Sequence, residues 1–243
     1  MSWQEAWTDR FYRSRPEWKD GTTEFHQLCA AQLDRKGMIL EVGAGPTNPT
    51  SAYLSTLGEL HGVDVSEEVL GNVHLKRGSV LTDATFPYED DSFDLAVSNY
   101  VVEHIPDAHD HLREVARVLK PGGAYVFRTP NLWHYVAIVA RLTPDSVHKA
   151  LANRLRNLSE EEHEPWPTVY AMNTPRRVHE VARATGLTVR SLDMCEKEPS
   201  YGMYARPLFL TFMAYERVVN ASPLLAGLRA NMFVVLGKPS ATA

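Results

Sequence analysis

The chain has 243 residues, 25 of them basic and 30 acidic, so its formal net charge is −5. This balance provides no general attraction to nucleic acid, and no basic run stands out along the chain. The length suffices for one full α/β core, alone or with a cap. Cys29 and Cys195 are far apart and lack the spacing of a metal site, which predicts free thiols in a reducing compartment.

The N-terminus does not have the basic-then-apolar layout of a signal peptide. No stretch reaches the roughly 18 uninterrupted apolar residues that a membrane helix needs. We therefore expect a soluble, cytoplasmic protein that has no membrane partner. Residues 1–35 are rich in aromatic side chains, which most often pack a segment onto a core, and a helix is expected through 22–35.

The most informative stretch is residues 38–49. An aliphatic run containing Glu41 predicts a buried parallel strand, and Gly43 and Gly45 can adopt positive φ and let a ligand approach the backbone. Pro49 suits the first position of a helix predicted over 49–57. A carboxylate at the end of the first strand repels a pyrophosphate and attracts an ammonium group. Glu41 therefore favours a ligand that carries an amino acid over a dinucleotide.

A second strand, predicted over 59–66, contains Asp64 about twenty residues beyond the glycine turn. A carboxylate there can accept hydrogen bonds from both hydroxyls of a ribose. The alternative is that Asp64 only caps a helix starting near residue 66. A short third strand is expected at 73–77.

The run Glu41-Val42-Gly43-Ala44-Gly45 resembles the first motif of the class I S-adenosylmethionine-dependent methyltransferases, E/D-x-G-x-G-x-G, with Thr47 in place of the last glycine. The resemblance extends over roughly ninety residues. It includes an Asp-Ser-Phe-Asp turn at 91–94, a Glu-His-Ile run at 103–105 and an Arg-Val-Leu-Lys-Pro-Gly-Gly run at 117–123.

The resemblance implies S-adenosylmethionine as cofactor. It implies that Asp64, with the adjacent Val65, binds the ribose, that Asp83 accepts from the adenine amine, and that the Ala84 backbone meets the ring nitrogen. For Asp83 an Asx turn is the alternative. In the family an N-terminal helical segment often covers the ligand, so residues 1–35 are a candidate lid with Tyr12 as its contact.

A fourth strand should end at Asn99, at the sheet edge where open α/β folds bind ligands. His104, in the following Glu-His-Ile run, titrates near neutrality and could remove a proton from an attacking hydroxyl or amine. It could instead hold the cofactor loop or contact a ligand. Apolar residues with helical spacing predict a helix over 107–119 that is stopped by Gly122 and Gly123, and a fifth strand at 124–128.

Residues 129–172 are expected to be a helical insertion after the fifth strand that builds the pocket of the methyl acceptor. Its candidate contacts are His134, Tyr135, His163 and Tyr170, each of which could equally be a packing or surface residue. The acidic run around His163 lacks the ligand spacing of a metal site, so no metal is expected.

Further along, we expect a helix opened by Asn173-Thr174-Pro175, a strand at 187–192, a largely buried helix at 209–219 and a last strand at 231–236. The sequence thus predicts one domain over 1–243, with a lid (1–35), a cofactor-binding core (36–128), an insertion (129–172) and a C-terminal part of the sheet (173–243). Its fold class is α/β, a Rossmann-like doubly wound sheet. The resemblance implies seven strands, the last running antiparallel between the fifth and sixth.

The resulting functional prediction is methyl transfer from S-adenosylmethionine to an O, N or C nucleophile of a small organic molecule. Three alternatives stay open: other chemistry with the same cofactor, releasing methylthioadenosine; a nicotinamide-binding oxidoreductase; and a non-catalytic binding protein. The sequence does not identify the acceptor or the oligomeric state.

Overall fold

A computed structural model describes residues 2–135, 138, 167–199 and 202–240. The chain forms two compact units, each of which is treated by itself. The sheet unit comprises Glu24–Pro130, Pro167–Asp193 and Met232–Ala243, and the helical unit comprises Met1–Thr23, Asn131–Trp166 and Met194–Asn231. The division of the chain into lid, core and insertion stays a prediction.

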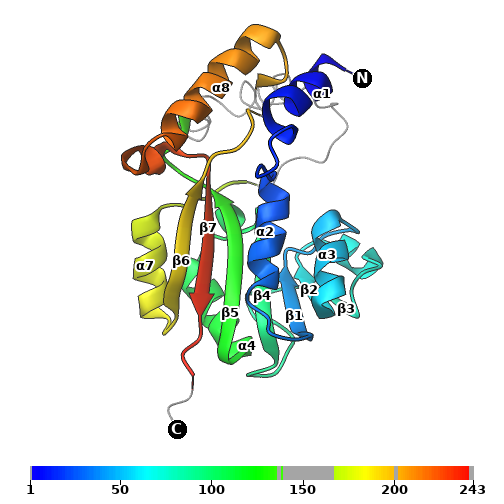
Figure 1. Ribbon diagram of the computed structural model, residues 1–243. Coiled ribbons are helices and arrows are strands. Elements are labelled where there is room, and N and C mark those ends of the chain that lie inside the picture. Colours follow the sequence, from blue (N-terminus) through cyan, green and yellow to red (C-terminus); the bar gives the residue numbers. More distant parts are fainter. Residues whose placement is uncertain (1, 136–137, 139–166, 200–201, 241–243) are drawn as a thin grey trace. The chain divides into compact units, whose positions relative to one another are not determined.

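Seven strands make one sheet in the order β3-β2-β1-β4-β5-β7-β6 (Figure 1). The pairs β1–β2, β2–β3, β1–β4 and β4–β5 are parallel. The strands span Gly37–Val42 (β1), Gly58–Asp64 (β2), Arg77–Val80 (β3), Phe93–Asn99 (β4), Leu119–Pro130 (β5), Thr188–Cys195 (β6) and Asn231–Gly237 (β7). This confirms the predicted doubly wound sheet.

The last strand, β7, runs antiparallel to its neighbours. The Gly122 N–H donates to the Lys238 carbonyl at 3.0 Å, and the Lys238 N–H donates to the Gly123 carbonyl at 3.0 Å. The residue after the end of β7 therefore lies beside the beginning of β5. The Thr188 hydroxyl, at the start of β6, donates to the Gly237 carbonyl at the end of β7. The expected orientation of the last strand is confirmed.

The helices of the sheet unit begin where the sequence supplies a capping side chain. Asn48 caps α3 (Pro49–Leu57), Asp107 caps α4 (Ala108–Val118) and Thr174 caps α7 (Pro175–Ala184), each by accepting from a backbone N–H of the first turn. Helix α2 (Gly21–Ala30) is shorter than the predicted 22–35. Helices α4 and α7 pack against each other.

Several elements differ from the prediction in their boundaries or their type. The third strand is Arg77–Val80 and not 73–77, because residues after the 3₁₀-helix η2 (Glu67–Gly71) form a turn in which the Leu75 N–H donates to the Asn72 carbonyl. The helix that was considered to start near residue 66 is thus the 3₁₀-helix η2 and not an α-helix. Helix α4 ends at Val118, before the glycines, because β5 already begins at Leu119 and a register shift against β4 accommodates the Pro-Gly-Gly turn.

The helical unit contains α1 (Trp3–Thr8), the π-helix η1 (Asp9–Arg13), α8 (Arg206–Asn220) and the 3₁₀-helix η5 (Pro223–Leu228). The N-terminal aromatic side chains pack around Phe209, with the Trp7 ring centroid 5.5 Å away. The expectation that 209–219 is largely buried is wrong, because Leu210 and Val218 are exposed by 43% and 58%. The helix buries only one face.

Neither Cys29 nor Cys195 forms a disulfide, and Cys29 is buried. In the described part of the chain, no helix is both long and apolar enough to cross a membrane.

Candidate functional site

The predicted cofactor residues of the sheet unit gather at the carboxyl ends of β1, β2 and β4. Glu41 lies near the end of β1, Asp64 is the last residue of β2 and Asn99 is the last residue of β4. The strand order reverses between β1 and β4, and this is the switch point at which open α/β sheets bind ligands.

The loop after β1 is held against β2 by its own backbone. Gly43 and Gly45 have φ of 75° and 51°, as the sequence predicts. The Gly43 N–H donates to the Val63 carbonyl at 2.8 Å, and the Gly45 N–H donates to Asp64 Oδ2 at 2.8 Å. Asp64 Oδ1 accepts from the Ser66 N–H at 2.8 Å. Each carboxylate oxygen keeps a further lone pair, so a fixed Asp64 can still accept from two hydroxyls.

Two asparagines that sequence reasoning missed support this loop. Asn48 Nδ2 donates to the Ala44 carbonyl at 2.8 Å, while its Oδ1 caps α3. Asn72 is 5% exposed, and its Nδ2 lies 2.9 Å from Ser51 Oγ and 3.1 Å from the Pro46 carbonyl. The Asn-Pro pair that opens α3 could have signalled the first of these roles. No local sequence signal marks Asn72.

Glu41 is buried beneath the loop, with 3% of its surface exposed. Ser51 Oγ donates to its Oε2 at 2.6 Å. Burial raises the pKa of this carboxyl to about 7, the Ser51 hydrogen bond opposes the rise, and the negative charge of Asp64 adds to it. A buried carboxylate with one hydrogen-bond donor among the described residues gains from an additional positive partner, which agrees with the predicted preference for an ammonium group.

We expect Glu41→Gln to change the pH dependence of stability. The folded protein holds this proton up to a pH of about 7, whereas the unfolded chain releases it near 4.5, so ionisation of Glu41 lowers the free energy of unfolding as pH rises across that interval. The difference corresponds to about 3 kcal/mol at most. Glutamine keeps an acceptor for Ser51 and removes this pH dependence.

The measurement is urea unfolding of both proteins at about pH 5 and about pH 8. The variant should gain stability relative to wild type at the higher pH only. Glu67→Gln, which removes an exposed carboxylate, is the matched control and should leave the wild-type pH dependence in place. An identical pH dependence in wild type and Glu41→Gln would contradict the assignment.

At the end of β4, Asn99 joins three elements. Its Nδ2 donates to Thr50 Oγ1 on α3 at 3.0 Å, and its Oδ1 accepts from Arg128 Nε on β5 at 2.8 Å. Arg128 is only 6% exposed, and its guanidinium lies 4.4 Å from the ring centroid of Tyr100, whose φ is 58°. Sequence reasoning missed Arg128, although an arginine closing the apolar run Tyr125–Phe127 was a usable signal.

The Glu-His-Ile run forms the 3₁₀-helix η3 (Val102–His104) and is tied to the segment that precedes α7. Glu103 is 4% exposed and accepts from Thr129 Oγ1 at 2.9 Å, and burial raises its pKa. The Glu103 carbonyl accepts from the Tyr170 N–H at 3.0 Å. His104 Nδ1 lies 3.0 Å from the Pro167 carbonyl, which can only accept. Nδ1 therefore carries the hydrogen, and Nε2 is left as the basic nitrogen.

The remaining predicted cofactor residues of this unit are not joined to the glycine loop by hydrogen bonds within the described residues. Asp83 is exposed, and its Oδ1 accepts from the Thr85 N–H at 2.8 Å, which is the Asx turn considered as the alternative. Ala84 and Val65 are also exposed. An exposed edge is compatible with an adenine ring, so their proposed roles stay predictions.

Three predicted residues belong to the helical unit and lie in its packed clusters. The Tyr12 hydroxyl donates to Glu216 Oε2 at 3.2 Å, and burial raises the pKa of the phenol. His134 Nε2 is 3.4 Å from Glu196 Oε2. The Tyr135 ring stacks on Phe212 at 5.3 Å between centroids. His163 lies outside the described residues. The lid and acceptor roles of these residues stay predictions.

Among the described residues, no group of three His, Cys, Asp or Glu side chains could hold a metal ion.

Comparison with known proteins places residues 40–127 in a family described as "Methyltransferase domain". The uncharacterised methyltransferase YcgJ of Bacillus subtilis (strain 168) is 26% identical over 180 residues, which are 67% of this chain and 66% of that protein. A demethylmenaquinone methyltransferase of Staphylococcus haemolyticus (strain JCSC1435) is 34% identical over 100 residues, 36% of this chain and 41% of that enzyme. The chain thus spans less than two thirds of the length of these relatives.

Two solved structures share the fold. The [4+2]-cyclase SpnF aligns with 93% of this chain and 84% of its own at a TM-score of 0.56 and 20% identity. Geranyl diphosphate C-methyltransferase from Streptomyces coelicolor A3(2), crystallised with Mg²⁺, geranyl diphosphate and S-adenosyl-L-homocysteine, aligns with 89% of this chain and 80% of its own at a TM-score of 0.54 and 15% identity.

Proposed function

Because the chain belongs to the class I S-adenosylmethionine-dependent methyltransferase family, we propose that it methylates an O, N or C nucleophile of a small organic molecule. The observation that carries this proposal is the convergence of Glu41, the Gly43–Gly45 loop and Asp64 at one edge of the sheet, with Gly45 and Asp64 joined at 2.8 Å. The two carboxyl groups and the glycine loop, which lets a ligand approach the backbone, suit a nucleoside that carries an amino acid.

When bound, S-adenosylmethionine supplies an electrophilic methyl group on a cationic sulfonium. The chain's residues then have separate tasks. Asp64 accepts from the ribose hydroxyls, the two glycines permit close approach of the ligand to the backbone, and Glu41 balances the charge of the amino group. Asp83 and the Ala84 backbone meet the adenine, and Asn99 lines the far side of the site.

The acceptor would approach near the Glu-His-Ile turn. His104 presents Nε2 as a base because Nδ1 is engaged by the Pro167 carbonyl, so it can take a proton from a hydroxyl or amine. Tyr170 lies beside this turn through its backbone bond to Glu103. Most of the rate enhancement would come from holding the acceptor and the methyl group in line, because correct orientation of two reactants lowers the activation barrier.

The alternative function is other chemistry with the same cofactor. The cyclase SpnF shares the fold, and a shared fold does not determine the reaction. Use of S-adenosylmethionine without methyl transfer would release methylthioadenosine, whereas methyl transfer releases adenosylhomocysteine.

The test is incubation of the full chain with S-adenosylmethionine that carries a trideuterated methyl group, together with a panel of small phenols, amines and quinols. Mass spectrometry should find the labelled methyl on one acceptor class and an equal amount of adenosylhomocysteine. Release of methylthioadenosine, with no labelled acceptor, would reject methyl transfer in favour of the alternative.

A further inference from the structure

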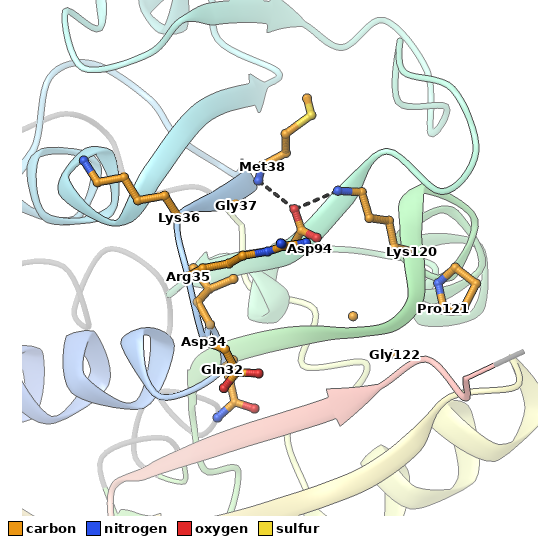
Figure 2. Close-up of a pocket in the computed structure, with 12 residues that line it drawn as sticks. Gln32, Asp34, Arg35, Lys36, Gly37, Met38, Asp94, Lys120, Pro121 and Gly122 are labelled. Atoms are coloured by element: carbon orange, nitrogen blue, oxygen red, sulfur yellow. Dashed lines mark hydrogen bonds and ion pairs between the residues drawn. The ribbon is translucent and has the colours of Figure 1, made fainter.

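A carboxylate near each end of strand β4 is held by a residue of β5. At the amino edge of the sheet, Asp94 Oδ2 accepts from Lys120 Nζ and from the Met38 N–H, each at 2.8 Å (Figure 2). Just beyond the carboxyl end of β4, Glu103 Oε2 accepts from Thr129 Oγ1 at 2.9 Å. The first carboxylate is thus bonded to a cation, whereas the second, at the edge that carries the proposed site, is bonded to a neutral hydroxyl.

The hydrogen of the Thr129 hydroxyl has a fixed direction. Asn173 Nδ2 lies 2.7 Å from Thr129 Oγ1 and 2.8 Å from the Pro130 carbonyl. A carbonyl only accepts, so the nitrogen of this amide and not its oxygen must face Pro130. Because Thr129 Oγ1 accepts from the same nitrogen, the one hydrogen of the hydroxyl is left for Glu103. The three side chains therefore form a directed set of hydrogen bonds, here called the Thr129 network, from Asn173 through Thr129 to Glu103.

The Thr129 network is buried. Thr129, Asn173 and Glu103 are exposed by 0%, 1% and 4%. Burial raises the pKa of the Glu103 carboxyl, and hydrogen bonds from its own backbone and from Thr129 oppose the rise, as do the charges of His104 and Arg128. Asn173 Oδ1 is buried and meets no hydrogen-bond donor in the part of the chain that the structure describes. Because an unpaired buried oxygen destabilises a fold, a contribution to stability does not by itself account for the network.

Thr129 is bonded to both of the segments that meet at His104. Glu103 and His104 belong to the 3₁₀-helix η3, and Asn173 belongs to the segment that begins with Pro167. The hydrogen bond between His104 Nδ1 and the Pro167 carbonyl, at 3.0 Å, joins the same two segments. Thr129 therefore anchors both partners of this hydrogen bond to one point near the end of β5.

We propose that Thr129 is a positioning residue for His104. Its hydroxyl ties the turn that carries His104 and the segment that carries Pro167 to β5, and so holds His104 Nδ1 against the Pro167 carbonyl. Nε2 is then left without a hydrogen and is able to accept a proton. This inference rests on the proposed function, in which His104 takes the proton of the methyl acceptor.

The test determines the tautomer of His104 in the full chain, by NMR of protein labelled with ¹⁵N-histidine at about pH 8, where an ordinary imidazole is mostly neutral. His104→Gln identifies the signals of this ring. The wild-type ring should carry its hydrogen on Nδ1 alone. Thr129→Val, which keeps the size and branching of the side chain and removes the hydroxyl, should give signals averaged over both tautomers. Thr129→Ser keeps the hydroxyl and should retain the wild-type pattern.

The expected change is a loosening of the turn. Backbone hydrogen bonds from the Val169 and Tyr170 N–H groups to the Glu103 carbonyl, at 2.7 and 3.0 Å, remain in Thr129→Val and should keep it folded. If Thr129→Val does not fold, Asn173→Ala tests the same claim, because it removes the group that directs the Thr129 hydroxyl. This variant should also average the two tautomers, and a wild-type pattern in it would overturn the proposal.

Thr188→Val is the matched control. Its hydroxyl donates to β7 at the start of β6, at the edge of the sheet opposite His104, so the His104 signals should not change. A single Nδ1–H tautomer in Thr129→Val, averaged tautomers in Thr129→Ser, or averaged tautomers in the wild type would each overturn the proposal. Absence of methyl transfer would instead reject the proposed function, and it would leave these signals as they are.

Discussion

Replacement of Asp64 by alanine is expected to weaken adenosylhomocysteine binding by about 100-fold or more. Two charge-assisted hydrogen bonds from the ribose, at about 1.5–3 kcal/mol each, are lost. The variant also frees the Gly45 and Ser66 N–H groups, both of which now donate to this carboxylate at 2.8 Å. The glycine loop would then also lose the hydrogen bond from Gly45 that holds it to the end of β2.

Titration calorimetry of Asp64→Ala and wild type measures this effect directly. Asp110→Ala removes an exposed carboxylate from α4, and it serves as the matched control for charge. Asp64→Asn separates the two contributions, because the amide oxygen still accepts one hydrogen bond while the charge is gone. Wild-type affinity in a folded Asp64→Ala protein would show that this residue only caps the turn after β2.

The second large effect is expected at Gly43. Its φ is 75°, and an added Cβ would lie 2.2 Å from Val101 Cγ2 and 2.9 Å from Val101 Cγ1. Gly43→Ala should lower the free energy of unfolding by roughly 2–5 kcal/mol, since left-handed backbone costs about 1–2 and overpacking about 1–3 kcal/mol. Adenosylhomocysteine binding should fall with it, because the loop must shift to relieve the clash.

A double variant distinguishes the two causes. Gly43→Ala combined with Val101→Ala removes both Cγ contacts and leaves the Cβ of residue 101 at 3.1 Å together with the backbone strain, so it should recover part of the loss measured by chemical denaturation. Gly71→Ala is the control, because Gly71 has no atom within 4 Å of a built Cβ and no positive φ. If Gly43→Ala keeps wild-type stability, the tight contact with Val101 is not a constraint on the loop.

The parts of the fold that the sequence predicts well are those with strong local signals. Helix α3 begins and ends as predicted because Asn48 and Pro49 determine its first turn. The boundary of β3 was wrong because Val73-His74-Leu75-Lys76 alternates apolar and polar side chains as a strand does, although these residues form the turn before β3. The start of the fifth strand was wrong, at 124 instead of Leu119, because the Pro-Gly-Gly turn belongs to an irregular strand, which only the pairing with β4 reveals.

In the candidate site, too, residues with a local sequence signal could be predicted and residues that depend on distant contacts could not. Gly43, Gly45 and Asp64 are predictable, because they follow apolar strands at characteristic positions, and the structure joins Gly45 to Asp64. Asn72, Thr129 and Asn173 could not be predicted, because their roles depend on contacts far along the chain. Thr129 Oγ1, for example, donates to Glu103 and accepts from Asn173 Nδ2 at 2.7 Å.

The most direct test of the central proposal is calorimetric titration of the purified full chain with S-adenosylmethionine, adenosylhomocysteine and NAD. We predict micromolar binding of both sulfur nucleosides and none of NAD, since Glu41 disfavours a pyrophosphate at the glycine loop and Asp64 accepts from the ribose. Binding of NAD, or of neither sulfur nucleoside, would contradict this account of the carboxyl edge of the sheet.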